Sequence, residues 1–334
     1  MSLYLILLFI VALVLLANWL TQQNNPTFNI LFDRVLLVFN LPIIFSGILL
    51  ALLSPEAIEV LRTQGGLLLD NFPAAGAAIG LMGGWGVLVS LRGVRQFLAR
   101  WLPFNPETAV HTLALYFSGF LVGNTLLTLT QGGLTEMAVT AQAADIGDLV
   151  VQQALFVLLA LFGVGLLIRR NGHALSERLG LLPITGAQIR MGIRWIVILV
   201  LVQWVAGAIW ALIDPAQSEL VDSISGELFS GLDTVWEWFV LALAAGMGEE
   251  ILFRGALQPV FGVWFTAVLF AVAHVQYGIT PITLVVLIIG LVLGHIRQRT
   301  NTSVAIFVHF GYNFVLGMLA LLALYAQQFV NAGG

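Results

Sequence analysis

Three short polar motifs lie inside strongly apolar sequence in the last third of the chain. They are Glu249-Glu250-Ile-Leu-Phe-Arg254, Phe270-Ala-Val-Ala-His274 and His309-Phe-Gly-Tyr-Asn313. Ionisable groups at membrane depth are costly, so by default they mark functional sites. Two carboxylates, an arginine, two histidines and an amide in neighbouring apolar segments predict a reaction site.

Helical geometry separates the roles of the two adjacent glutamates. Glu250 and Arg254 are four residues apart with the acid on the N-terminal side, an order in which the two charges neutralise each other favourably. Glu249 points about 100° away from Glu250, so Arg254 does not neutralise it. We therefore expect the Glu250–Arg254 pair to be structural and Glu249 to do chemistry.

Peptide hydrolysis is one reaction that these residue types can support. It needs a positioned water, a base that deprotonates the water, and donors for the developing oxyanion. Glu249 with His274 can hold and activate the water. His309 and Asn313 lie one turn apart on one helical face and can donate to the oxyanion. Phe270 shares a face with His274, and we expect it to pack there.

The same side chains also suit a metal ion. One glutamate and two histidines form a known catalytic zinc set, which here would be Glu249, His274 and His309. The sequence lacks the His-Glu-x-x-His helix of common zinc peptidases, and it contains no cysteine. Chemistry alone leaves a glutamate-activated water and a zinc-bound water both open.

The three motifs, in this order on consecutive apolar segments, resemble those of the type II CAAX prenyl endopeptidases, also called CPBP or Abi intramembrane proteases. The resemblance covers roughly residues 175–325 and includes the lead-in Arg178-Leu-Gly-Leu-Leu-Pro183. It implies an intramembrane endopeptidase acting on a membrane-associated peptide or protein. Prenylated CAAX tails are the substrates of one branch of this family.

The resemblance also implies roles for individual residues. Glu249 and His274 would activate the water, and His309 and Asn313 would form the oxyanion site. Glu250 and Arg254 would lie beside that site. The resemblance favours a glutamate-dependent reaction without a cofactor over a zinc-dependent one.

The composition shows what kind of protein must position these motifs. The chain has 334 residues, 60% of them hydrophobic and 9% charged, with a mean hydropathy of +1.00. This composition predicts a multi-pass protein of the cell membrane, surrounded by the lipid bilayer. Long continuous apolar runs favour an all-α helical bundle over a β-barrel. A net charge of −4 argues against a nucleic-acid partner.

Apolar runs of about 20 residues predict ten membrane spans. The predicted spans are 2–20, 35–53, 72–91, 108–127, 147–168, 190–213, 236–258, 260–279, 281–297 and 303–325. If the eighth span starts near Trp264, helical rise places Glu249 roughly 13 Å and His274 about 15 Å from the inner ends of their spans. His309 and Asn313 lie about 9 and 15 Å in, so the motifs are expected at one level.

Arginine placement predicts the orientation and the division of the chain. Arginines follow the third span, fill the loop between the fifth and sixth, and follow the ninth, which makes that side cytoplasmic. The opposite segment 214–237 is acidic and has no basic residue. We expect a five-span region of unknown role at 1–170 and a protease-like domain at 171–330. The spacing of Gly76, Gly80 and Gly84 predicts close helix packing.

Two functions from other classes stay open on the sequence alone. A transporter could use Glu249 and the histidines as a proton relay, although no internal repeat typical of transporters is visible. An immunity-type membrane protein could bind a peptide in the same cavity without cleaving it. The first alternative predicts substrate flux without proteolysis, and the second predicts a function that survives Glu249→Gln.

Overall fold

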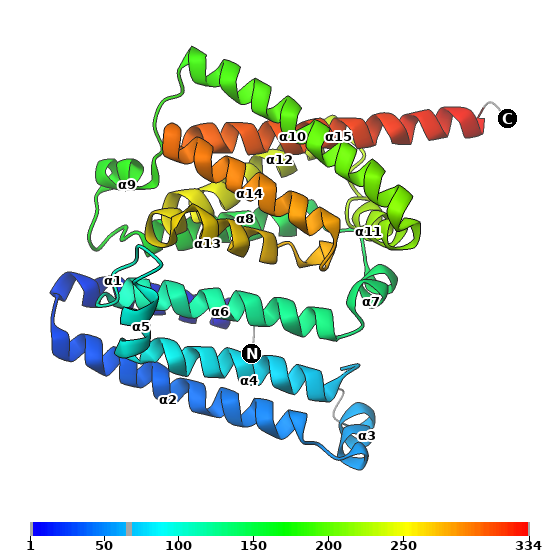
Figure 1. Ribbon diagram of the computed structural model, residues 1–334. Helices are drawn as coiled ribbons and strands as arrows, with labels where there is room; N and C mark the ends of the chain where they lie inside the picture. Colours follow the sequence, from blue (N-terminus) through cyan, green and yellow to red (C-terminus); the bar gives the residue numbers. More distant parts are fainter. Residues whose placement is uncertain (1–2, 65–68, 333–334) are drawn as a thin grey trace. The chain divides into compact units, whose positions relative to one another are not determined.

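The computed structural model describes residues 3–64 and 69–332, and the regular elements in these ranges are all helices (Figure 1). The predicted all-α fold is therefore confirmed. Contacts divide the chain into two compact units. Unit 1 comprises Met1–Thr140 and Val260–Ile279, and unit 2 comprises Ala141–Pro259 and Thr280–Gly334. These units are defined by packing, so the functional division at residue 170 stays a prediction.

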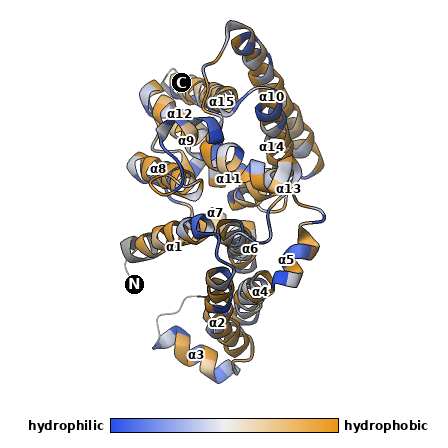
Figure 2. Cartoon of the chain, turned by 90° about the vertical axis from the view of Figure 1, so that its left-hand side faces the viewer, coloured by the Kyte–Doolittle hydropathy of each residue, from blue (hydrophilic) through white to orange (hydrophobic). Residues whose placement is uncertain are grey.

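Unit 1 contains the first seven helices, most of a later one and a short 3₁₀ helix. They are α1 (Leu3–Gln23), α2 (Pro26–Ala51), α3 (Pro55–Thr63), α4 (Phe72–Ser90), α5 (Arg92–Leu98), α6 (Ala109–Thr130), α7 (Gly133–Thr140), α13 (Gln258–Val272) and the short 3₁₀ helix η2 (Val275–Tyr277). Helices α2, α4 and α6 lie side by side in this order. Hydrophobic residues dominate α2 and α4, as membrane-spanning helices require (Figure 2).

Glycines allow α2 and α4 to approach closely. A Cβ atom on Gly47 or Gly76 would collide with the backbone of the other helix, and Gly83 also faces the α2 backbone. A Cβ on Gly80 or Gly84 would meet nothing within 4 Å. The predicted glycine ridge is thus right for Gly76 and wrong for the other two. Positions four apart along a helix drift around its axis. Positions seven apart, such as Gly76 and Gly83, return to nearly the same face.

Unit 2 contains the remaining helices, and its central member carries the two glutamates. The helices are α8 (Ile146–Gly163), α9 (Gly172–Leu179), α10 (Gly186–Ile213), α11 (Pro215–Leu228), α12 (Val235–Glu250), the π-helical turn η1 (Ile251–Leu257), α14 (Pro281–Arg299) and α15 (Thr302–Ala332). Helix α12 packs against α8 and α15, and α15 also packs against α10 and α14. The end of α12 that carries the glutamates is therefore flanked by α8 and by α15.

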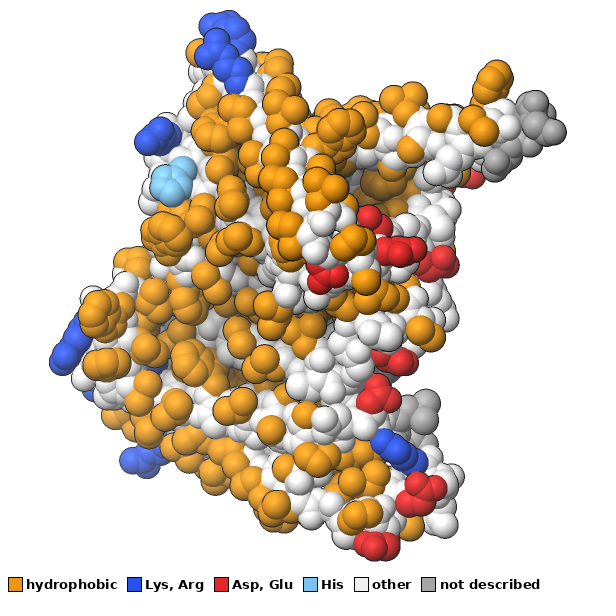
Figure 3. Space-filling model, turned by 45° about the vertical axis from the view of Figure 1, so that its right-hand side comes forward, with side chains coloured by type: hydrophobic (Ala, Val, Ile, Leu, Met, Phe, Trp, Pro, Cys, Tyr) orange, Lys and Arg blue, Asp and Glu red, His pale blue; other side chains and the backbone are white. Residues whose placement is uncertain are grey.

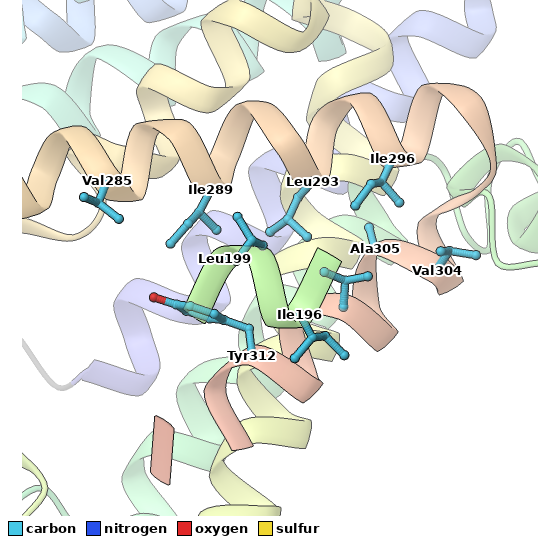
Figure 4. Close-up of a cluster of buried hydrophobic side chains, with 10 residues drawn as sticks. Ile196, Leu199, Val285, Ile289, Leu293, Ile296, Val304, Ala305 and Tyr312 are labelled. Atoms are coloured by element: carbon cyan, nitrogen blue, oxygen red, sulfur yellow. The ribbon is translucent and has the colours of Figure 1, made fainter. Parts of the chain in front are cut away.

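A buried apolar cluster fixes the rotation of α15 in unit 2 (Figure 4). Its members come from α10, α14 and α15 at spacings of three or four residues, which is one face of each helix. They are Ile196, Leu199, Val285, Ile289, Leu293, Ile296, Val304, Ala305, Val308 and Tyr312. Since Val304, Val308 and Tyr312 point toward α10 and α14, the neighbouring His309 is turned toward a different side of α15.

The described residues contain eight helical stretches that are long and apolar enough to cross a membrane. Ten were predicted, and the difference lies in two places. The first predicted span, 2–20, begins outside the described residues and corresponds to α1, which is not among the eight stretches. The predicted spans 236–258 and 260–279 form one stretch, Val235–Val272, interrupted at Gly262 with φ 80° and ψ 171°. The chain is a multi-pass membrane protein.

Charged side chains of unit 2 gather at the two ends of α10 (Figure 3). Arg190 and Arg194 lie in its first turns, and the acidic α11 follows its last turn directly. This separation is what the positive-inside rule expects for a helix that crosses the bilayer.

Candidate active site

Two glycines bring other helices close to the end of α12. A Cβ on Gly246 would lie 3.0 Å from the backbone nitrogen of Phe310 on α15. A Cβ on Gly248 would collide with Gln153 of α8. These positions immediately precede Glu249, so α8 and α15 both approach α12 at the level of the glutamates.

Glu250 is the centre of a buried ionic network in unit 2. Its side chain and that of Arg254 are 0% and 1% exposed, with 3.2 Å between Oε2 of the carboxylate and Nε of the guanidinium. His309 donates from Nδ1 to Oε1 of the same carboxylate at 2.9 Å. A buried carboxylate is tolerable only when it is paired and hydrogen-bonded, and here two side chains provide that. The expected Glu250–Arg254 pair is present, and His309 binds the same carboxylate.

The hydrogen bond to Glu250 decides what the other ring nitrogen of His309 can do. A carboxylate only accepts, so Nδ1 carries a hydrogen and the orientation of the ring is held. When the ring is doubly protonated, Nε2 also carries a hydrogen and can donate to an oxyanion. Asn313 lies one turn further along α15 and is half-buried.

Glu249 has a different environment from its neighbour. It is half-buried, and its Oε1 accepts a hydrogen bond from Nε2 of Gln153 at 3.3 Å. Gln153 lies on α8 and is 8% exposed. Sequence reasoning missed this contact, although an amide inside an apolar span is a signal of the kind that singled out the three motifs.

Helix α9 connects the π-helical turn to the start of α15. Arg178 donates from Nη1 to the carbonyl oxygen of Gly255 at 2.7 Å and from Nη2 to that of Ala256 at 3.3 Å. The backbone nitrogen and hydroxyl of Thr302 bind the carbonyl oxygens of Gly180 and Leu179. The lead-in motif therefore fixes the two segments that carry Arg254 and His309.

Arg178 stays charged in this position. Burial, helped by the charges of Arg170, Arg297 and Arg169, lowers the pKa of Arg178 to about 10. The guanidinium is still protonated at neutral pH and can donate to both carbonyl groups. Its contacts stabilise the widened turn η1, and π-helical turns of this kind occur frequently at functional sites.

The structure places His274 differently from the sequence-based expectation. The predicted span 260–279 would hold it within a helix, but α13 ends at Val272 and His274 has φ −98° and ψ 50°. Its Nδ1 lies 2.7 Å from the carbonyl oxygen of Phe270, and its backbone nitrogen binds Ala271 instead. The imidazole thus takes the place of the backbone donor that a continuing helix would supply. The predicted position inside the span was wrong for this reason.

This contact fixes the tautomer of His274. A carbonyl oxygen only accepts, so Nδ1 carries the hydrogen and Nε2 of the neutral ring is an acceptor. Phe270 is buried with its ring centroid 4.7 Å from that of His274, in agreement with a packing role. Within unit 1, the Thr125 hydroxyl donates to the carbonyl oxygen of Val272 at 3.0 Å and ties this helix end to α6.

The predicted site residues are thus distributed over both units. Unit 2 carries Glu249, Glu250, Arg254, His309 and Asn313. Glu250 is joined to Arg254 by an ion pair and to His309 by a hydrogen bond. Phe270 and His274 belong to unit 1. Within the described ranges, no group of three or more histidine, aspartate or glutamate side chains is arranged to hold a metal ion.

Comparison with known families identifies the segment that carries the motifs. Residues 231–315 match the family model described as type II CAAX prenyl endopeptidase Rce1-like. This confirms the resemblance, over a shorter stretch than the roughly 175–325 expected from the sequence, and the matched stretch contains all three motifs. No curated protein and no solved structure matches the chain.

Proposed function

We propose that this protein is an intramembrane endopeptidase that cleaves a peptide bond in a membrane-associated peptide or protein. The observation that carries the proposal is the contrast between the two adjacent glutamates in the Rce1-like segment. Glu250 is committed to Arg254 and His309, whereas Glu249 is half-buried and receives a hydrogen bond from a neutral amide. Glu249 is thus the carboxylate suited to act as a base.

In the proposed reaction, Glu249 takes a proton from a water molecule whose oxygen attacks the scissile carbonyl carbon. His274 helps to hold this water through Nε2, because its Nδ1 is occupied by the Phe270 carbonyl group. The carbonyl oxygen becomes an oxyanion that accepts hydrogen bonds from Nε2 of His309 and from the amide of Asn313. The C–N bond then breaks, and protonated Glu249 gives its proton to the leaving amine.

The substrate class follows from the family and from the environment of the site. The family model is that of prenyl endopeptidases, so we propose a prenylated CAAX tail as the first substrate to examine. A prenyl chain would hold such a peptide at the surface of a bilayer. We place the protein in the cell membrane with the reaction near its cytoplasmic face, the side predicted to carry the arginine-rich loops.

The proposal is tested with the purified protein reconstituted in vesicles and a fluorescent prenylated CAAX peptide. Glu249→Ala and His274→Ala are each expected to abolish cleavage, and Gln152→Ala, an exposed change on α8, is expected to keep it. Cleavage that persists in both site variants would show that the mechanism is wrong. Ion flux without cleavage would favour the transporter alternative, and a function that survives Glu249→Gln would favour the peptide-binding one.

A further inference from the structure

Helix α8 contributes a side chain to the site from outside the segment that matches the family model. Gln153 precedes residue 231, where the match begins, and lies in the region to which the sequence assigned no role. Its Nε2 donates to Oε1 of Glu249 across 3.3 Å. The donor and acceptor are 96 residues apart in the chain, so this contact exists only because α8 packs against α12.

The surroundings of Gln153 are built to hold its amide at this place. The side chain is 8% exposed, although burying an amide in an apolar helix is costly without hydrogen bonds. The absent Cβ of Gly248 leaves the space that the amide oxygen and Cβ of Gln153 occupy. The preceding Gln152 is exposed, so the two adjacent glutamines on α8 are in opposite environments.

We propose that Gln153 is a positioning residue for Glu249, whose carboxylate it holds in one rotation. This inference rests on the proposed function, in which Glu249 is the base. A general base must lie within hydrogen-bond reach of the proton that it takes, so a donor that fixes the rotation of the carboxylate also fixes the distance from the base to the water.

The first experiment compares Gln153→Met with Gln152→Met in the reconstituted enzyme. Methionine has a similar length and no hydrogen-bond donor, and the second variant makes the same chemical change on the exposed face of α8. For Gln153→Met we expect kcat to fall about tenfold or more with KM nearly unchanged, because positioning is lost and substrate binding is not. Gln152→Met should leave both kcat and KM unchanged.

A second variant reaches the same contact from the other helix. A Cβ on Gly248 would overlap the amide oxygen, the Cβ and the backbone oxygen of Gln153, so Gly248→Ala should displace Gln153 from Glu249 and reproduce the loss of kcat. In the double variant Gly248→Ala with Gln153→Met, the two losses should not add, because both remove one interaction. Additive losses, or an unchanged kcat in Gln153→Met, would overturn the proposal.

A double-mutant cycle on thermal stability separates this proposal from the proposed activity. It compares the melting temperatures of the parent protein, Gln153→Met, Glu249→Met and the double variant in detergent, without any substrate. If the two side chains are in contact, the changes should not add, and the same cycle with Gln152→Met should be additive. Non-additivity without peptide cleavage by the parent protein would sustain the contact and refute the protease. Cleavage by the parent protein with additive changes would refute the role of Gln153.

Discussion

Adjacent glutamates at the end of one helix meet different neighbours because consecutive helical residues point about 100° apart. Glu250 is directed into the protein, where Arg254 and His309 bind both of its oxygens. Glu249 is directed toward α8 and meets an uncharged amide. The two glutamates are therefore suited to different roles, which substitution can separate.

Replacing each glutamate by glutamine should therefore give opposite patterns. Glu250→Gln removes the buried negative charge beside Arg254, and we expect a loss of about 3–5 kcal/mol of stability. Glu249→Gln keeps a similar shape at a half-buried position, so the melting temperature should stay close to that of the parent. Its cleavage activity should fall by about 10²-fold or more, because the base is lost. Thermal unfolding in detergent and peptide cleavage measure the two effects.

Equal losses of melting temperature in the two variants would contradict this separation of roles. Arg254→Gln provides a further comparison, because it removes the other charge of the same buried pair. It is expected to destabilise the protein as strongly as Glu250→Gln does.

Removal of metal ions distinguishes the two candidate ways of activating water. In the glutamate-dependent reaction, treatment with 1,10-phenanthroline followed by gel filtration should leave cleavage unchanged. A zinc-bound water held by Glu249, His274 and His309 would instead lose activity and regain it on addition of zinc. The rate of peptide cleavage before and after treatment is the measurement, and recovery with zinc alone would refute the glutamate mechanism.

At the scale of elements, helix ends carry two of the candidate reacting groups, Glu249 and His274. The end of α12 widens into η1, which Arg178 holds through two carbonyl oxygens. The end of α13 is closed by the ring of His274, which binds the Phe270 carbonyl group. In both places a side chain satisfies backbone groups that the helix leaves open, and in the second that side chain is itself a proposed catalytic residue.

The double role of His274 can be separated by substitution. Asparagine has its Nδ2 close to the position of the histidine Nδ1, so His274→Asn should keep the bond to Phe270 and lose Nε2. We expect cleavage to fall about 10²-fold with little change in melting temperature. His274→Ala should lose cleavage and also about 1 kcal/mol of stability. If both variants melt at the same temperature, the bond to Phe270 does not stabilise the helix end.

The crossing of α2 and α4 gives a prediction for unit 1. Gly76→Ala puts a methyl group against the α2 backbone, and we expect it to cost about 1–3 kcal/mol. Gly80→Ala, one turn along the same helix, points into open space and should be neutral or slightly stabilising. Thermal unfolding of the two variants measures the difference. A neutral Gly76→Ala would show that α2 and α4 can separate without loss of stability.

The sequence predicted the helical class, most spans and the Glu250–Arg254 pair because each depends on local periodicity. It did not predict that α13 ends at Val272, since the bond that ends the helix is made by a side chain of the turn itself. The contact of Gln153 with Glu249 was also missed, because no local pattern reports which distant helices pack together. Local pattern therefore singled out the candidate reacting groups, and packing decided their partners.

The whole molecule has an unusual set of ionisable residues for a topology experiment. All 13 of its basic residues are arginine, and it has no cysteine. The arginine-rich α9 region and the acidic α11 lie before and after α10, whose 28 residues span about 42 Å. This length exceeds the roughly 30 Å hydrocarbon core of a bilayer, so the two regions should face opposite sides of the membrane.

Single cysteines introduced into the cysteine-free chain test this topology directly. His173→Cys on α9 and Ser223→Cys on α11 are both exposed positions in unit 2. With a membrane-impermeant maleimide, Ser223→Cys should react in intact cells, and His173→Cys should react only after the cytoplasmic face is opened. The unmodified chain should give no signal. The reverse pattern would invert the assigned orientation and place the arginine-rich loops outside, and reaction of both cysteines in intact cells would show that α10 does not cross the membrane.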